Sequence, residues 1–241
     1  MAAALPAAPP PTPTAESRVR VAVRYGIDGD QRYLSHHDEL RALSRALLRA
    51  RWPVAYSQGF NPQPRVMIVL PRPVGTASDC QLALVTVRAQ PDGPPPPPSL
   101  AAALPTGWSL HDVAVPAPPG VPQPVRARFA LALAPDDAAT LPERCAALLA
   151  ADGLTITRTT ARGQPLGTLD VRPFVEALEL DGLRLMLVLR YEGQRSARPS
   201  ELLPVLGLDA GRYRHHVRLI AVEWHPAWEG PTVRPPTDKG L

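Results

Sequence analysis

A stretch rich in proline divides the chain. Residues 91–124 hold 12 prolines, including the run Pro94 to Pro98. Proline fixes φ and lacks a backbone N–H donor, so this composition favours a stiff, extended linker or an insertion over a packed element. With 241 residues the chain is long enough for one large domain or two small ones. We therefore predict two folded units, residues 18–90 and 125–225, on either side of this stretch.

Both predicted units begin with the same succession of patterns. Residues 18–25 alternate polar and apolar side chains, which predicts a strand, and helical spacing follows from Ser35 until Pro53. The second unit opens with an alternating strand at 125–133, a helix at about 136–150 and a strand at 154–159. Further strands are expected at 53–56, 65–70, 80–87, 183–190 and 215–224, and a short helix near 199–207. This order predicts an α+β fold of two ferredoxin-like βαβ-type units with mainly antiparallel sheets.

The ends of the chain, its hydrophobic runs and its cysteines bear on whether the protein is secreted, membrane-bound or metal-binding. Residues 1–17 and 226–241 are expected to be disordered tails. The opening segment lacks the basic start of a secretory signal, and Arg or Pro interrupts every hydrophobic run, so we expect a cytoplasmic protein with no membrane partner. Cys80 and Cys145 lack the close spacing of zinc or iron–sulfur ligands, so we expect two buried thiols and no metal or cofactor in this chain.

Positive charge is concentrated in the first half of the chain. The formal net charge is +4, and Lys239 is the only lysine. Through Arg88 there are 11 arginines against 6 acidic residues, while the rest of the chain is close to neutral. Arginine binds phosphates with a planar fork of donors, so this excess permits nucleic-acid binding. A GC-rich genome would also replace lysine with arginine, which leaves a compositional origin open.

The start of the first helix carries the candidate catalytic residues. Ser35 and Asp38 have the spacing of a capping box, which is a structural role that competes with catalysis by Asp38. His36 and His37 would lie in the first turn, where free amides and the helix dipole favour an anion. Adjacent positions on a helix point about 100° apart, so the two imidazoles are not expected to share a metal. The catalytic candidates are therefore His36, His37 and Asp38, with no metal site.

A row of arginines and a loop form the candidate binding surface. Arg41, Arg45 and Arg49 recur every four residues, about 6 Å apart along a helix, as either a solvated face or a ridge that contacts phosphates. In the following loop, Tyr56 and Phe60 either join the core or stack on bases. The candidate residues for nucleic-acid or anion binding are Arg41, Arg45, Arg49, Arg65, Tyr56, Ser57, Gly59, Phe60 and Asn61.

These motifs resemble a known family. The segment YLSHHDELRALSRALLRARWPVAYSQGFNPQPRV, residues 33–66, is similar to the radical-SAM-associated domain family in its Ser-His-x-Asp helix start, arginine-rich helix and S-x-G-F-N-P-x-P loop. Residues 169–180 and 198–207 also resemble that family, so the likeness covers most of residues 18–222. Gln63 stands where the family pattern has a histidine. The resemblance implies a radical-SAM partner, and any iron–sulfur chemistry would come from it because this chain has no CxxxCxxC motif.

Three functional hypotheses follow. The first is an accessory protein that binds RNA for a radical-SAM modification enzyme. The second is a metal-free RNA-processing or RNA-modifying enzyme in which His36 or His37 acts as the base. The third is an adaptor that docks on the radical-SAM partner. No standard catalytic motif is present to identify a reaction.

Overall fold

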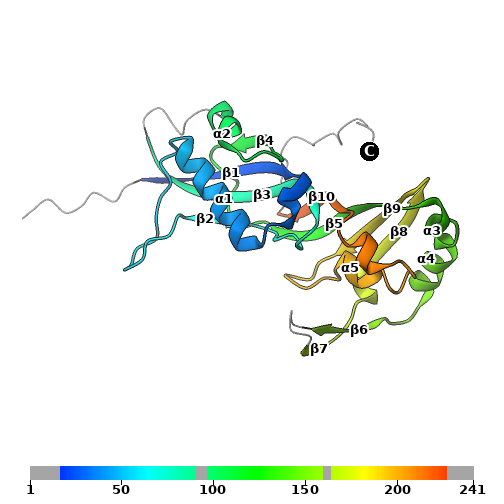
Figure 1. Ribbon diagram of the computed structural model, residues 1–241. Coiled ribbons are helices and arrows are strands. Elements are labelled where there is room, and N and C mark those ends of the chain that lie inside the picture. The colour runs from blue at the N-terminus through cyan, green and yellow to red at the C-terminus, as the bar shows by residue number, and fades with distance from the viewer. Residues whose placement is uncertain (1–16, 91–96, 160–163, 227–241) are drawn as a thin grey trace, which may run out of the picture.

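The computed structural model describes residues 17–90, 97–159 and 164–226, and the expected tails lie almost entirely outside these ranges. Eight strands form one sheet in which the path β4-β1-β3-β10-β5-β9-β8 runs through both halves of the chain (Figure 1). All but one of the strand pairs in this sheet are antiparallel. The predicted α+β class and the mainly antiparallel pairing are confirmed.

The N-terminal unit places both of its helices on one face of four strands. The strand order is β4-β1-β3-β2, and α1 and α2 connect β1 to β2 and β3 to β4. Buried side chains from α1, α2, β1 and β3 share one apolar cluster, so the helices cover the same sheet face. The elements are β1 (Arg18–Ile27), η1 (Gly29–Tyr33), α1 (His36–Arg49), β2 (Val66–Ile68), β3 (Ala77–Arg88), α2 (Pro97–Ala103) and β4 (Trp108–Ala114).

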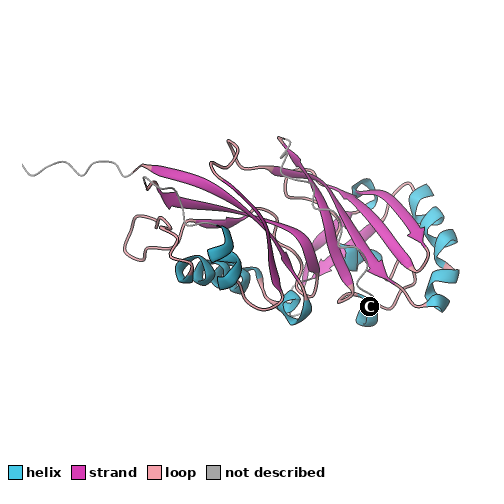
Figure 2. Cartoon of the chain, turned by 90° about the horizontal axis from the view of Figure 1, so that it is seen from above, coloured by secondary structure: helices cyan, strands magenta, loops and turns pink. Residues whose placement is uncertain are grey.

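The C-terminal unit repeats this arrangement with the order β10-β5-β9-β8. Its helices also pack on one sheet face, over a second apolar cluster (Figures 1 and 2). An additional hairpin, β6–β7, lies outside the main sheet. The elements are β5 (Gln123–Ala132), α3 (Pro135–Ala139), α4 (Leu141–Ala150), β6 (Thr155–Thr159), β7 (Pro165–Asp170), η2 (Arg172–Phe174), β8 (Val175–Asp181), β9 (Arg184–Arg190), α5 (Pro199–Leu202), α6 (Ala210–Tyr213) and β10 (Val217–His225).

The two units are joined through the edges of their sheets. Strands β10 and β3 pair in parallel over two residues, at Arg218↔Ala77 and Leu219↔Ser78. The Arg218 guanidinium lies 2.7 Å from Asp28 and 2.6 Å from Asp79, both in the N-terminal unit. The last strand of the chain therefore makes one continuous sheet where the sequence predicts separate sheets.

Helix α1 begins and ends where its sequence predicts. The Asp38 amide donates to Ser35 Oγ at 3.2 Å, and the Ser35 hydroxyl donates to Asp38 Oδ2 at 2.7 Å, so Ser35 is the N-cap. Leu43 and Leu47 are fully buried on the inner face. Arg51 has φ of 59°, and this left-handed residue reverses the chain direction just before Pro53.

Three expectations about secondary structure need correction. Residues 97–114, expected to be linker or insertion, carry α2 and β4, because a proline in the first helical turn loses no hydrogen bond and because Leu100 and the Trp108 ring are buried. Residues 53–56 make only isolated bridges, at Val54 and Tyr56. The helix expected at 136–150 is divided into α3 and α4 at Thr140.

Cys80 and Cys145 are buried free thiols, as expected, and burial raises the pKa of Cys80 to about 12. No helix among the described residues is long and apolar enough to cross a bilayer.

Candidate nucleic-acid interface

The outer face of α1 presents three exposed arginines. Arg41 lies 3.3 Å from the Asp38 carboxylate, and Arg49 donates to the Ala103 carbonyl at 2.6 Å. Arg45 has no ion-pair or hydrogen-bond partner among the residues that the structure describes. The hydrogen bond from Ser35 and the charge of Arg41 lower the pKa of Asp38. This aspartate is therefore an ionised capping residue of α1.

Acidic residues are absent from the long stretch of sequence that follows the first turn of α1. Between Leu40 and Ser78 the sequence contains no Asp or Glu but six arginines. Five of the six are exposed, namely Arg41, Arg45, Arg49, Arg51 and Arg65, while Arg72 is buried. Of these five, only Arg41 has a carboxylate partner within the described residues, Asp38, and clustered charges of one sign sum to a local potential that attracts a polyanion. The positive charge predicted for the first half is thus concentrated on α1 and the loop that follows it.

That loop, residues 56–65, forms a braced projection that we call the finger. Tyr56 and Pro64 form a bridge at its base, Ser57 N donates to Gln63 O at 2.8 Å, and Gln63 N donates back to Ser57 Oγ at 2.9 Å. Gly59 has φ of 133°, a conformation that favours glycine. Phe60 is fully exposed at 109%. Figures 1 and 2 both show the finger leaving the molecule at the end remote from the C-terminal unit.

A pocket of about 270 Å³ opens at the base of the finger. Two of its lining residues, Arg18 and Arg88, are register partners across β1 and β3. Each of these two side chains carries a guanidinium group, which binds an anion such as phosphate through charge-assisted hydrogen bonds. Arg88 N also donates to the Pro53 carbonyl at 2.8 Å, which ties the pocket to the chain leaving α1. The full lining is Arg18, Val54, Ala55, Tyr56, Ser57, Gln58, Pro62 and Arg88.

Sequence reasoning did not identify Arg18 and Arg88 because they are 70 positions apart and meet only through strand register. It did identify Tyr56, Ser57, Gly59, Phe60 and Asn61, which the structure places in the finger. Arg65 lies at the finger base, where its Nε donates to the Tyr56 carbonyl at 3.3 Å. A pair of arginines at the ends of two alternating strands is the signal that could have indicated the pocket.

A buried polar cluster fixes the start of α1. Glu39 Oε2 lies 3.0 Å from Arg72 Nε, and the Tyr25 hydroxyl donates to Glu39 Oε1 at 2.9 Å. Arg72 also donates to backbone carbonyls of Gln31 and Thr76. Burial raises the pKa of Glu39 more than its ion pair lowers it, and burial also lowers the pKa of Arg72. Neither Tyr25, Glu39 nor Arg72 was among the residues singled out from the sequence.

The candidate catalytic histidines lie apart from the finger. His36 and His37 begin α1, with ring centroids 5.7 Å apart, whereas the finger follows the other end of this 14-residue helix. A helix of that length spans about 20 Å. Burial and the neighbouring His37 lower the pKa of His36. Within the described ranges, no three His, Cys, Asp or Glu side chains are grouped so that they could hold a metal ion.

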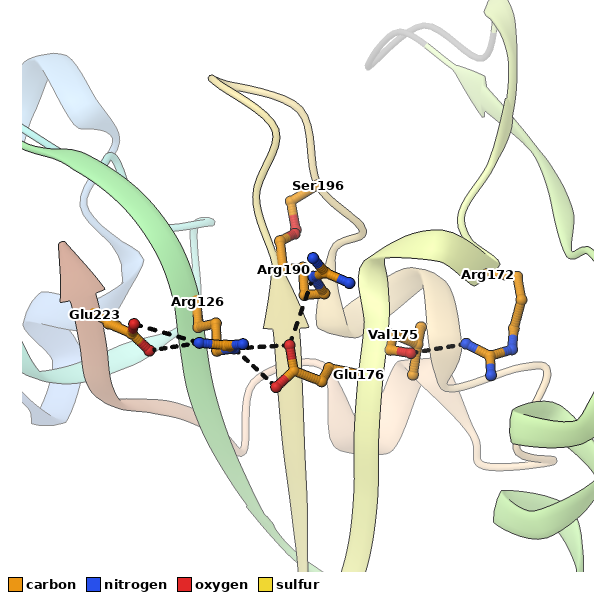
Figure 3. Close-up of polar contacts among 7 residues, drawn as sticks. All are labelled: Arg126, Arg172, Val175, Glu176, Arg190, Ser196 and Glu223. Carbon is orange, nitrogen blue, oxygen red and sulfur yellow. Dashed lines mark hydrogen bonds and ion pairs between the residues drawn. The ribbon is translucent and has the colours of Figure 1, made fainter. Parts of the chain in front are cut away.

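The C-terminal unit uses its arginines differently. Arg126 lies 2.7 Å from Glu176 and 3.0 Å from Glu223, and Arg190 lies 3.6 Å from Glu176 (Figure 3). Arg172, also drawn in Figure 3, donates to the Val175 carbonyl at 2.8 Å. Arg126 and Arg190 are therefore paired with carboxylates, and Arg172 is used for a backbone contact.

Comparison with known families adds one finding. A family model described as an uncharacterized protein conserved in bacteria (DUF2344) matches residues 20–199. The chain belongs to this DUF2344 family. The matched region contains all of α1 and the finger, so the arginine row lies inside the conserved domain. The description assigns no activity to the domain. A search of curated proteins finds no match.

Proposed function

We propose that this DUF2344 protein is an accessory protein that binds RNA through α1 and the finger. The observation that carries the proposal is the exposed arginine row of Arg41, Arg45 and Arg49, which lies in a stretch of 39 residues without a carboxylate. Guanidinium groups about 6 Å apart on one helix face neutralise successive backbone phosphates and release condensed counterions. RNA affinity should therefore fall steeply with salt.

The proposal includes a ferredoxin-like architecture for each unit. The orders β4-β1-β3-β2 and β10-β5-β9-β8, each with two helical crossovers on one face, support it. This scaffold also carries RNA-binding domains that stack bases on aromatic residues of the open sheet face. Here the open face of the C-terminal unit carries paired Arg126 and Glu176 instead. We therefore assign RNA binding to the helix and finger of the N-terminal unit.

A radical-SAM protein is proposed as the partner that modifies the bound RNA. The family resemblance of residues 33–66 supports this partner. An adaptor that only docks on that protein is the second candidate function, and the fully exposed Phe60 favours it because apolar side chains anchor protein interfaces. Docking should resist salt, whereas RNA binding should not.

RNA binding is tested by titrating the full chain into fluorescein-labelled bulk transfer RNA at several salt concentrations. Replacing Arg41, Arg45 and Arg49 with Gln should weaken binding about tenfold or more and reduce the salt slope by about 2. The matched control replaces Arg190, Arg198 and Arg212 with Gln. These changes remove the same charge from the C-terminal unit, where all three arginines are paired with carboxylates.

The control triple variant should lose less than about threefold. Equal losses in both variants would mean that only net charge matters and would contradict the assigned surface. Absence of RNA binding by the wild type, with salt-resistant copurification of a radical-SAM protein, would establish the adaptor instead.

A further inference from the structure

We infer that the finger recognises an unpaired nucleotide, with its base stacked on Phe60 and its phosphate held between Arg18 and Arg88. The inference rests on the proposed RNA binding and names the substrate class. The RNA should contain a single-stranded segment or an open loop at the point of contact.

The exposure of Phe60 is the first argument. A phenylalanine side chain that is 109% exposed gains no burial from folding, although Ile68 of β2 and most apolar residues of β3 are buried. Burial of such a ring against a partner is favourable, and each nucleobase offers a flat π-face. The surrounding surface is positive, so its complementary partner is a polyanion that also carries flat apolar groups. Single-stranded RNA has both properties.

The bracing of the finger is the second argument. Reciprocal bonds between Ser57 and Gln63, and the bond from Arg65 N to Ala55 O at 2.8 Å, fix both strands of the finger before any partner arrives. Preorganisation lowers the entropy lost on binding. Asn61 and Gln58 are also exposed near the tip and offer amide donors and acceptors for a base edge.

The pocket supplies the third argument, because it places a phosphate site beside the finger. Arg18 and Arg88 oppose each other at the ends of β1 and β3, and Tyr56 and Ser57 of the finger complete the wall. A phosphate between two guanidinium groups accepts charge-assisted hydrogen bonds from both. A backbone that enters this pocket leads its neighbouring base toward the finger.

Duplex RNA cannot satisfy this arrangement in the same way. Bases in an A-form helix are stacked on one another, and the deep major groove is closed to side chains. Unpaired bases in loops and single strands leave both faces available to an aromatic ring. The finger should therefore separate single-stranded RNA from duplex RNA, whereas the α1 arginines should bind both.

The experiment compares a fluorescein-labelled 12-nucleotide RNA with the same strand annealed to its complement. Phe60→Ala should weaken single-strand binding by about tenfold and change duplex binding by less than about twofold. Phe60→Trp should bind the single strand about as well as the wild type does, because tryptophan supplies another aromatic ring for stacking. Met67→Ala, at a side chain 49% exposed outside the finger, is the matched control and should change neither.

Arg18→Gln combined with Arg88→Gln should weaken single-strand binding independently of Phe60. Equal loss of both RNA forms in Phe60→Ala, or no loss of either, would overturn the inference while leaving RNA binding intact. Failure of the wild type to bind either RNA would overturn the proposed function itself. Circular dichroism of each variant separates lost contacts from lost folding.

Discussion

The two units share one strand order but differ in how many carboxylates surround their arginines. In the N-terminal unit, arginines of α1 and the finger point to solvent within a stretch that has no carboxylate. In the C-terminal unit, Arg126 and Arg158 lie within 2.8 Å of Glu176 and Glu201. The same scaffold can therefore keep its charge balanced or accumulate charge for a ligand. We therefore assign the proposed RNA binding to the N-terminal unit.

Their interiors differ as well. The N-terminal unit buries the Glu39–Arg72 ion pair, while the core cluster of the C-terminal unit is formed by apolar side chains. A buried ion pair has a large desolvation cost and contributes little net stability. Here it holds η1 and the start of α1 in one position, which sets the direction of the arginine row. The buried Glu39–Arg72 pair thus helps to position the exposed arginines of α1.

The largest expected effect is on stability. Arg72→Met leaves buried Glu39 without its partner and several carbonyls without a donor, and should cost about 3 to 5 kcal/mol of unfolding free energy. The equivalent change in the other unit, Arg158→Met, breaks a partly exposed pair with Glu201 and should cost about 1 kcal/mol. Urea denaturation measures both. Similar losses would remove the contrast between the two interiors.

A smaller effect on RNA affinity is expected from adding a carboxylate to α1 or removing one from the C-terminal unit. Leu48→Glu introduces an acid beside Arg45 on the exposed face of α1, where the wild-type leucine is 47% exposed. It should lower RNA affinity about two- to fivefold through one new surface ion pair. Glu223→Gln, which removes one partner of Arg126, should leave RNA affinity within about twofold. RNA titrations that show the reverse order would place the binding surface on the C-terminal unit.

The smallest effect concerns pH. Burial and the adjacent His37 lower the pKa of His36, so the unfolded chain binds its proton more tightly than the folded chain does. The stability that neutral His36 provides is therefore present above pH 6.5 and lost as pH falls toward its folded pKa. The loss should be small, because solvent screens this partly exposed imidazole.

Unfolding free energies measured from pH 7.5 to 5.5 should show this loss in the wild type and a smaller one in His36→Asn. An unchanged slope in His36→Asn would mean that this imidazole titrates as it does in the unfolded chain.

Local patterns were sufficient to predict much of the fold. The Ser35 N-cap and the spacing of apolar residues predicted α1, because both are features of a single helix. Alternation located β1 and β5 for the same reason. Proline content misled the interpretation of residues 97–114, since composition does not reveal that Leu100 and Trp108 pack on the sheet. Pairing of β10 with β3 joins residues about 140 positions apart and has no local signature.

The candidate site also contains residues that local patterns predicted and residues that they did not. The arginine row and the finger are contiguous in sequence, so helical spacing and turn residues indicated them. The Arg18–Arg88 pocket depends on strand register. Buried Arg72 lies in a Pro-Arg-Pro-Val-Gly segment that has the composition of an exposed turn, and its partner Glu39 is 33 positions away. Long-range pairing of charges is the information that a single sequence does not display.

Ultraviolet crosslinking of the tagged full chain to RNA in cells, followed by mass spectrometry of the crosslinked peptides, tests the central claim most directly. We predict crosslinked nucleotides on residues 41–65, with Tyr56 or Phe60 among the modified residues, and loss of recovered RNA when Arg41, Arg45 and Arg49 are replaced by Gln. Crosslinks confined to residues 123–226, or no RNA above the level of an untagged control, would contradict the assignment of RNA binding to α1 and the finger.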